Sequence, residues 1–268
     1  MTELETDLLP RAQRGEPAAV EALLGAIAPR VRRFAQRLCG SAPDADDVLQ
    51  DTLLTVARQV GQFDGRGSLA SWVFTVTRNA CLRRRRGLKN APPRADDPEL
   101  PDDEPNPEAR AAESELVGAL RAALRELPLE AREVILLRDV EGLSAAEAAS
   151  VLRISQQALK SRLHRARSAL RERLEPWLEP SAPPPSASCP DVMALWSKKL
   201  EGDLNQLDCA TMEAHVLGCP ACGSACAALK QALDLCRRSA SETTVPPSVQ
   251  ARVKAATRAW AAERAHSG

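Results

Sequence analysis

The chain has 268 residues, enough for two or three small domains, and its 36 basic and 36 acidic side chains give a formal net charge of zero. Tyrosine is absent and only three residues are phenylalanine, while Ala, Leu, Arg and Glu abound, which favours an all-α fold over sheets. The sequence has no apolar run near ~18 residues and no apolar segment after a basic start, so it predicts a cytoplasmic protein rather than a secreted or membrane-spanning one.

Residues 1–87 predict a first helical domain. Two helices are expected within residues 5–40, broken at Gly15-Glu16-Pro17. A third is expected over residues 44–60, where Asp44 can cap the helix and the following carboxylates favour its positive end. Those carboxylates can also contact a partner protein, and both roles stay open.

A short glycine-containing loop, residues 61–67, precedes a predicted helix over residues 70–85. Trp72 lies on the apolar stripe of that helix, and basic residues crowd its end from Arg78 to Arg86. An aromatic residue, a glycine loop and a basic helix end suit a surface that grips a nucleic-acid strand. Trp72 can instead be an ordinary core residue, and the arginines can be a solvated helix end.

Residues 46–51 (DDVLQD) followed by residues 72–79 (WVFTVTRN) resemble the second domain of bacterial RNA polymerase sigma factors of the extracytoplasmic-function (ECF) group. By this resemblance, helix 44–60 docks on core RNA polymerase, while the loop and helix that follow take the minus-ten promoter element. The implied polymerase-binding residues are Asp46, Asp47, Leu49, Gln50 and Asp51. The implied minus-ten contacts are Phe63, Arg66, Ser68, Trp72, Arg78, Asn79 and Arg83.

Residues 88–112 change character. Six prolines lie between Pro92 and Pro107, and seven acidic residues lie between Asp96 and Glu108. This composition predicts a disordered acidic linker, whose charge would repel premature entry of DNA.

Residues 113–175 predict a second helical domain that contains a helix-turn-helix. Ser144 and Glu147 form a capping box, and Ser155 can cap a last helix over residues 156–173. That helix has one apolar stripe and a basic remainder, as entry into the major groove of DNA requires, although an ordinary basic surface helix has the same pattern.

Residues 158–167 (ALKSRLHRAR) resemble the recognition helix of the fourth sigma domain, which reads the minus-thirty-five element. Candidate base-edge readers lie in the N-terminal half of the helix: Gln156, Gln157, Lys160, Ser161 and Arg162. Arg165 and Arg167 are expected to contact phosphate.

A Pro/Ser linker at residues 176–188 leads to a cysteine-rich domain over residues 189–240. Its spacing predicts a tetrahedral Zn²⁺ site from one imidazole and three thiolates: Cys189, His215, Cys219 and Cys222. This pattern resembles the zinc-binding fold of anti-sigma factors, and cysteine-rich extensions also occur in CorE-like ECF sigma factors, which respond to copper, cadmium or zinc. Possible additional ligands are Cys209, Cys226 and Cys236.

Three interpretations of this domain stay open. It can be a structural zinc site, a sensor of Zn, Cd or Cu, or a thiol-redox switch built on Cys219 and Cys222. Cys39 and Cys81 are expected to be small core residues. A final helix over residues 248–264, within the segment 241–268, either packs on the cysteine-rich domain or docks on the sigma domains or polymerase.

The sequence therefore predicts an all-α, metal-regulated ECF sigma factor that binds core RNA polymerase and promoter DNA. A fused regulator would make a separate anti-sigma factor dispensable. A stand-alone helix-turn-helix repressor is disfavoured by residues 44–86. A zinc hydrolase, or any other enzyme, is disfavoured because the sequence offers no open metal site with a general base, no catalytic triad and no phosphate loop.

Overall fold

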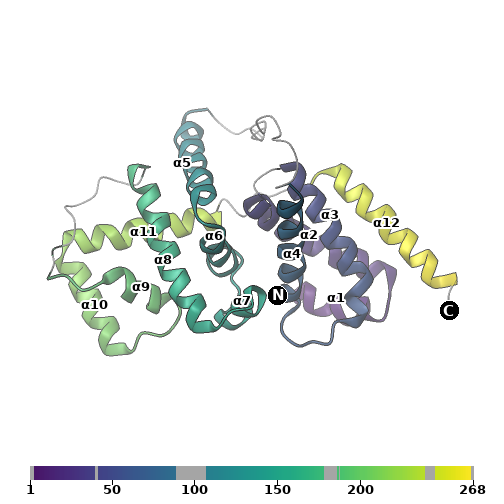
Figure 1. Cartoon of the computed structure of the whole chain (residues 1–268), viewed down its shortest axis with the longest axis horizontal. Helices are drawn as coiled ribbons and strands as arrows, with labels where there is room; N and C mark the ends of the chain where they lie inside the picture. The colour runs from purple at the N-terminus through teal and green to yellow at the C-terminus, as the bar shows by residue number, and fades with distance from the viewer. Residues whose placement is uncertain are drawn as a thin grey trace. The chain divides into compact units, whose positions relative to one another are not determined.

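The computed structural model describes residues 3–39, 42–88, 107–177, 186, 188–238 and 245–266. Within these ranges every regular element is a helix, which confirms the predicted fold class (Figure 1). The chain divides into two compact units, residues 1–102 with 242–268, and residues 103–241. In the part of the chain that is described, no helix is both long enough and apolar enough to cross a lipid bilayer.

The first unit packs helices around a shared apolar core. Its elements are α1 (Glu3–Gln13), α2 (Pro17–Cys39), α3 (Ala42–Gln59), the short 3₁₀ turn η1 (Val60–Gln62), α4 (Leu69–Leu88) and α12 (Pro247–His266). Gly15 has a φ of 83°, which lets the chain reverse between α1 and α2. Pro17 then begins α2, at a position where its missing N–H costs nothing. The break predicted at residues 15–17 is confirmed.

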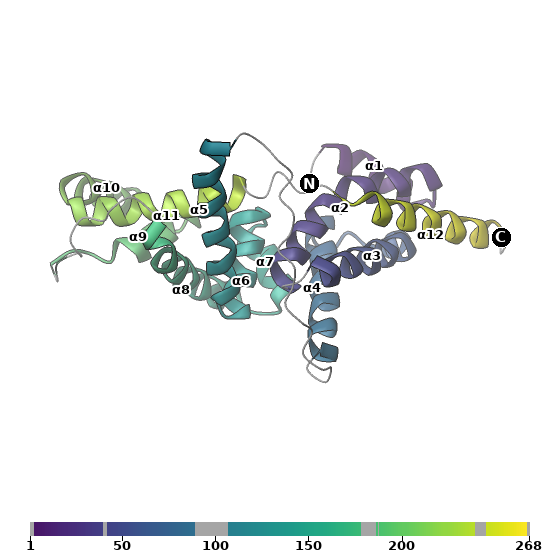
Figure 2. The same ribbon diagram turned by 90° about the horizontal axis from the view of Figure 1, so that it is seen from above.

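The final helix packs on the first unit. Val249 and Val253 of α12 belong to the same buried cluster as Leu24 of α2 and Leu53 of α3. Lys254 forms an ion pair with Glu21 at 3.4 Å. Of the two placements that the sequence leaves open, α12 therefore takes the one against the first helical domain; in both views it runs beside α3 (Figures 1 and 2).

The second unit contains the helix-turn-helix and the cysteine-rich segment. Its elements are α5 (Pro107–Glu126), α6 (Leu129–Ile135), the π-helical turn η2 (Leu136–Val140), α7 (Ala145–Leu152), α8 (Gln156–Leu174), the short 3₁₀ turn η3 (Glu175–Trp177), α9 (Val192–Leu200), α10 (Gln206–Gly218) and α11 (Pro220–Arg238). Helices α9 and α11 both pack against α8.

The helix-turn-helix follows its sequence signals closely. Both bonds of the predicted capping box form, from Glu147 N to Ser144 Oγ at 3.2 Å and from Ser144 N to Glu147 Oε2 at 2.8 Å. Arg153 ends α7 in a left-handed conformation, with a φ of 56°. Ser155 then accepts a hydrogen bond from the Ala158 N–H at 3.1 Å and caps α8, as predicted.

Three sequence predictions need correction. Helix α5 begins at Pro107, so residues 107–112 are helical rather than linker, whereas residues 89–106 of the expected linker lie outside the described residues. Helix α3 begins at Ala42, so Asp44 lies inside its first turn instead of capping it. Cys81 is a core residue as predicted, but Cys39 is only half-buried, and the two sulfur atoms are joined in a disulfide between α2 and α4.

Candidate nucleic-acid interface and metal centre

Four side chains of the cysteine-rich segment converge on one point. Cys189 precedes α9, His215 lies on α10, Cys219 joins α10 to α11, and Cys222 lies in the first turns of α11. Their ligand atoms all lie within 4.8 Å of one another. The Cys189 and Cys219 sulfur atoms are 3.8 Å apart, and His215 Nε2 is 3.3 Å from Cys222 Sγ.

This spacing fits a tetrahedral ion. With metal–sulfur distances of about 2.3 Å, two thiolates on a tetrahedral Zn²⁺ lie about 3.8 Å apart. Three thiolates and one imidazole are a common donor set for structural zinc. The four residues predicted as ligands could therefore hold Zn²⁺ without a large rearrangement.

Local capping places the three ligand-bearing segments. Asp191 caps α9 by accepting from the Ala194 N–H at 2.9 Å, and Asn205 caps α10 by accepting from the Asp208 N–H at 2.8 Å. The Cys219 N–H donates to the carbonyl of His215 at 2.8 Å, so the end of α10 folds its cysteine back beside its histidine. Pro220 then begins α11.

The charge balance of the cluster favours a cation. A hydrogen bond with Ser186 lowers the pKa of Cys189 to about 6. Burial, followed by the neighbouring Cys189 and Cys219 sulfurs, raises the pKa of Cys222 to about 12. Thiolates this close repel one another, and a divalent ion would remove that repulsion.

The remaining cysteines of the segment lie elsewhere. Among the described residues, the ligand atoms that come together belong to the set of four, without Cys209, Cys226 or Cys236. Cys226 and Cys236 are buried on α11, and burial raises the pKa of the Cys226 thiol. Cys209 lies on α10 with its sulfur 3.6 Å from a Glu213 carboxylate oxygen. The expectation that these three add ligands to the same site therefore finds no geometric support.

Helix α8 presents part of the predicted base-reading set to solvent. Gln156, Gln157, Ser161 and Arg165 are exposed. Leu159, Leu163, Ala166 and Leu170 form the buried stripe, as the sequence predicts. The N-terminal half of α8 thus exposes a polar face and buries an apolar one.

Two other candidate readers already have acidic partners. Lys160 Nζ donates to Asp203 Oδ1 at 2.7 Å, and Asp203 lies just after α9. Arg162 forms a longer ion pair with Glu130 of α6 at 3.3 Å. Lys160 is therefore paired with the cysteine-rich segment while staying partly exposed.

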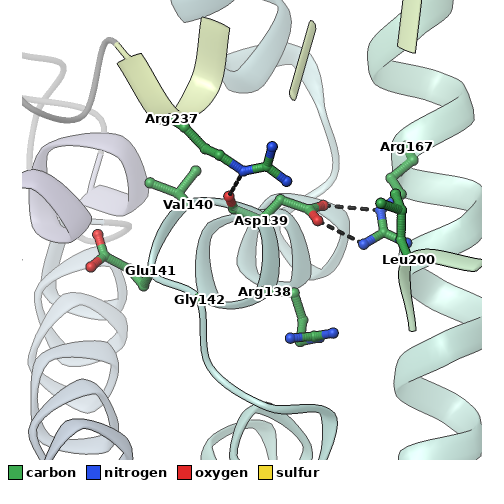
Figure 3. Close-up of a pocket in the computed structure, with 8 residues that line it drawn as sticks. All are labelled: Arg138, Asp139, Val140, Glu141, Gly142, Arg167, Leu200 and Arg237. Carbon is green, nitrogen blue, oxygen red and sulfur yellow. Dashed lines mark hydrogen bonds and ion pairs between the residues drawn. The ribbon is translucent and has the colours of Figure 1, made fainter. Parts of the chain in front are cut away.

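Arg167 departs most from the sequence expectation. Its side chain is only 2% exposed, so it cannot reach a DNA phosphate in this arrangement. It donates to both carboxylate oxygens of Asp139, at 3.1 and 2.6 Å (Figure 3). It also donates to Glu201 Oε1 at 2.9 Å. The predicted phosphate contact is replaced by an internal one, because two buried carboxylates compensate the buried charge.

Glu201 joins this network to η2. Its carboxylate is 2% exposed and also accepts from Arg138, with Nη2 at 2.5 Å and Nε at 3.0 Å from Oε2. The i→i+5 bond from Glu141 N–H to the Leu136 carbonyl makes the π-helical turn that carries Arg138 and Asp139. Beside this turn is a cavity of about 360 Å³, which Arg237 of α11 also lines (Figure 3).

Comparison with known proteins finds three matching families along the chain. A family model for sigma-70 region 2 matches residues 23–90, one for sigma-70 region 4 matches residues 118–170, and a zinc-finger model matches residues 189–223. The ECF RNA polymerase sigma factor SigM of Mycobacterium tuberculosis is 32% identical over 167 residues, which are 62% of this chain and 82% of that protein. The chain belongs to the ECF RNA polymerase sigma factors.

Two further relatives set the extent of the likeness. The ECF RNA polymerase sigma factor SigE of Mycolicibacterium smegmatis is 36% identical over 166 residues, and the match spans 60% of this chain and 64% of that protein. A solved structure of CnrH in complex with the cytosolic domain of CnrY is 25% identical, covers 65% of this chain and 99% of that chain, and has a TM-score of 0.48. Sigma factors are transcription regulators rather than enzymes.

In this ECF sigma factor, contacts at its two ends hold the loop that is expected to take the minus-ten element. Phe63 and Trp72, both half-buried, face each other with ring centroids 5.4 Å apart. The Phe63 carbonyl accepts from Gln13 Nε2 at 2.7 Å. Ser68 caps α4 through the Ser71 N–H at 3.2 Å, while Arg66 is 90% exposed beside Asp64.

Trp72 takes the core role that the sequence offers, and its contact with nucleic acid stays a prediction. It packs on the core of the first unit and shares its ring contact with the loop. One turn or more further along α4 lie Arg78 and Asn79, half-buried, and the exposed Arg83. The residues predicted to bind the single DNA strand therefore lie on α4 and on the loop before it.

Some of the α3 residues predicted to bind polymerase are buried or ion-paired in the structure. Leu49 is 0% exposed and belongs to the core, so its side chain is not on the surface in this structure. Asp46 pairs with Arg32 at 2.9 Å, and Asp47 pairs with Arg84 at 2.5 Å. Asp44, which is buried, accepts from the same Arg84.

Sequence reasoning missed the acidic partners of the sigma factor's basic residues. Glu201, Gly202 and Asp203 follow α9, and Gly202 has a φ of 72° that turns the chain after the helix. We call residues 201–203 the acidic turn. A Glu-Gly-Asp sequence signals a turn but does not name its partner, because the basic residues that it meets lie 34 to 63 positions away.

Proposed function

We propose that this ECF sigma factor directs core RNA polymerase to promoters and that metal binding at its own cysteine-rich domain controls how freely its recognition helix meets DNA. The observation that carries the proposal is the acidic turn, which pairs with Lys160 and Arg167 of α8. The turn follows α9, and the N-terminal side of α9 is anchored at the four-ligand cluster by Cys189.

The residues divide by role. Gln50 and the exposed Asp51 remain the candidates on α3 for contact with polymerase. On the promoter side, the single strand would meet Phe63, Arg66, Ser68, Trp72, Arg78, Asn79 and Arg83. The duplex would meet the exposed face of α8 through Gln156, Gln157, Ser161 and Arg165.

The acidic turn would compete with DNA for α8. A phosphate and the Asp203 carboxylate are both anions that an ammonium group binds, so Lys160 cannot pair fully with both. Phosphate contacts supply much of the affinity of proteins for duplex DNA. A turn docked on α8 should therefore weaken promoter binding, and a displaced turn should restore it.

Metal would act by holding the turn in place. Zn²⁺, Cd²⁺ or a copper ion would supply a fixed positive centre for Cys189, His215, Cys219 and Cys222, which belong to three separate segments. Joining these segments would order α9 and thus the acidic turn. An effector changes an equilibrium only through its different affinity for two states, so the metal must bind the docked state more tightly.

Helix α12 offers a second point of control within the first unit. It covers part of α2 and α3 through Val249, Val253 and Thr257, which are nearly fully buried. A cavity of about 420 Å³ lies along this contact and is lined by Leu24, Leu53 and residues of α12. Incomplete packing of this kind favours a reversible contact, and polymerase would compete with α12 for α3.

The test is transcription by purified sigma factor and core polymerase, first without metal and then with Zn²⁺, Cd²⁺, Cu⁺ or Cu²⁺ added singly. We expect one metal to change transcript yield in the native protein, and the double variant Cys219→Ser with Cys222→Ser to lose that response. The control Cys209→Ser should keep it, because Cys209 lies outside the four-ligand cluster. An unchanged metal response in the double variant would contradict the proposal.

Two other results would assign a different role to the domain. Equal transcription under all metals, with unfolding of the domain on chelation, would make the cluster a structural zinc site. A response to oxidants alone that requires Cys219 and Cys222 would make it a thiol-redox switch. A cytoplasmic location and independence from a separate anti-sigma factor stay predictions.

A further inference from the structure

The disulfide in the first unit is a second thiol site, separate in sequence and in fold from the metal cluster. Cys39 is the last residue of α2, and Cys81 lies in the second half of α4. Their Cα atoms are 5.4 Å apart, near the centre of the range for disulfides. The helices thus place the two cysteines at a separation that a disulfide spans.

The two sulfurs differ in access. Cys81 is 0% exposed, in the core formed by α2, α3 and α4. Cys39 is half-buried at the end of its helix. A small reagent in solution therefore meets Cys39 first, and Cys81 is reachable chiefly through Cys39.

The bond joins α4, which is predicted to bind the promoter strand, to α2. The bonded residues are 42 positions apart, and the closed loop contains all of α3. Cys81 lies between Arg78 and Arg83 of α4, two predicted contacts with DNA. Along the same α2–α4 seam, the Phe34 and Phe74 rings are 5.1 Å apart. Near Cys81, Arg84 also ties α4 to α3 through its pairs with Asp44 and Asp47.

We propose that Cys39 and Cys81 form a reversible dithiol–disulfide site that responds to low-molecular-weight disulfides, with Cys39 as the entry thiol and Cys81 as the resolving thiol. In the first step the Cys39 thiolate attacks one sulfur of the small disulfide. The old S–S bond breaks, a mixed disulfide forms, and one small thiol leaves with a proton. The Cys81 thiol then loses its proton and attacks Cys39 Sγ, which forms the protein disulfide and releases the second small thiol.

The consequence is a change in the rigidity of the first unit. In the thiol form α4 is held by side-chain packing and by polar contacts that include the Arg84 pairs. In the disulfide form the middle of α4 is fixed to α2 and the unfolded chain loses freedom, so the unit resists unfolding more strongly. The redox chemistry does not depend on the proposed role in transcription.

The test uses the full chain, loaded with zinc and fully reduced, and then exposed to oxidised glutathione. Peptide mapping by mass spectrometry should find residues 39 and 81 linked. The melting temperature of the first unit should rise by at least about 5 °C and fall again on reduction. Cys39→Ala should abolish the rise, whereas Cys209→Ala should preserve it. Failure of native protein to form the 39–81 link, or a rise that persists in Cys39→Ala, would overturn the proposal.

The order of attack has its own test. Cys81→Ala should accumulate glutathione on Cys39, whereas Cys39→Ala should carry at least about tenfold less on the buried Cys81 at the same time point. Equal labelling of the two variants would overturn the assignment of Cys39 as the entry thiol. Comparison of α4 hydrogen exchange in the reduced wild type and in Cys39→Ala shows whether the variant is folded.

Discussion

Arg167 shows how burial decides the role of a single basic residue. On the sequence it is one of several arginines on a DNA-binding helix, and in the structure it is the one whose guanidinium lies inside the protein. Desolvation lowers the pKa of Arg167, but hydrogen bonds and charges from Asp139 and Glu201 outweigh it, and the net shift is upward. Arg167 therefore links the helix-turn-helix to the cysteine-rich segment.

A substitution of Glu201 should measure this link. Glu201→Gln removes the charge that faces Arg138 and Arg167 in a site that is 2% exposed. We expect the free energy of unfolding of the second unit to fall by about 2–4 kcal/mol, because a buried cation then lacks its full compensation. Urea denaturation of the zinc-loaded chain, followed by circular dichroism, gives the value.

The matched control is Glu213→Gln, which breaks an exposed pair with Lys199. The Glu213 side chain is 52% exposed, so its pair is screened by water and the change should leave the free energy of unfolding nearly unaltered. If the two variants lose equal stability, the Arg167–Glu201 network does not hold the second unit together.

At the scale of elements, the acidic turn and the recognition helix are the pair that matters most. Helix α8 begins at the Ser155 cap and keeps its buried stripe, so its orientation does not depend on Asp203. The Lys160–Asp203 pair is partly exposed, with side chains 29% and 37% accessible. Such a pair contributes little to stability, but it can compete with phosphate for one lysine.

Asp203→Asn should therefore increase promoter affinity without unfolding the protein. We expect the dissociation constant of the reconstituted holoenzyme for duplex promoter DNA to fall by about threefold to tenfold at low salt. The slope of the logarithm of this constant against the logarithm of the salt concentration should become steeper by about one. Asp208→Asn, which changes the net charge equally on the exposed side of α10, is the control. Equal effects of the two substitutions would point to net charge alone and would contradict competition by the acidic turn.

At the scale of the whole molecule, different kinds of interaction stabilise the two units. The first unit is held by an apolar core that includes α12 and by the disulfide, whereas the cysteine-rich end of the second unit has a small core of Val192, Cys222 and Cys226. Helices α9 and α11 also pack on α8, but around the ligand cluster itself the core is small, so metal binding should add to the stability of this end.

Removal of metal should thus act on one unit. Chelation of the zinc-loaded chain should increase amide hydrogen exchange across α9, α10 and α11 by at least about tenfold while leaving α2 and α3 unchanged. Cys189→Ser should reproduce this loss of protection, and Cys209→Ser should not. Uniform loss of protection across both units would show that the metal stabilises the whole chain instead of the cysteine-rich helices.

Local signals determined much of this protein from its sequence alone. The all-α class, the break at residues 15–17, the capping box at Ser144, the cap at Ser155 and the four-ligand set depend on neighbours within a few residues or on a characteristic spacing. The paired motifs of the sigma domains also lie within short windows. Such signals survive in sequence because backbone hydrogen bonds and metal geometry act at short range.

Only the tertiary structure decided which charges meet and which thiols bond. It buried Arg167 and Leu49, paired Lys160 with Asp203, joined Cys39 to Cys81 and placed α12 on α2 and α3. These contacts join residues 40 or more positions apart, or depend on which face of a helix is covered. The charge or hydrophobicity of a residue does not specify which distant residue it will contact. The sequence therefore identifies the interacting groups but not their pairing.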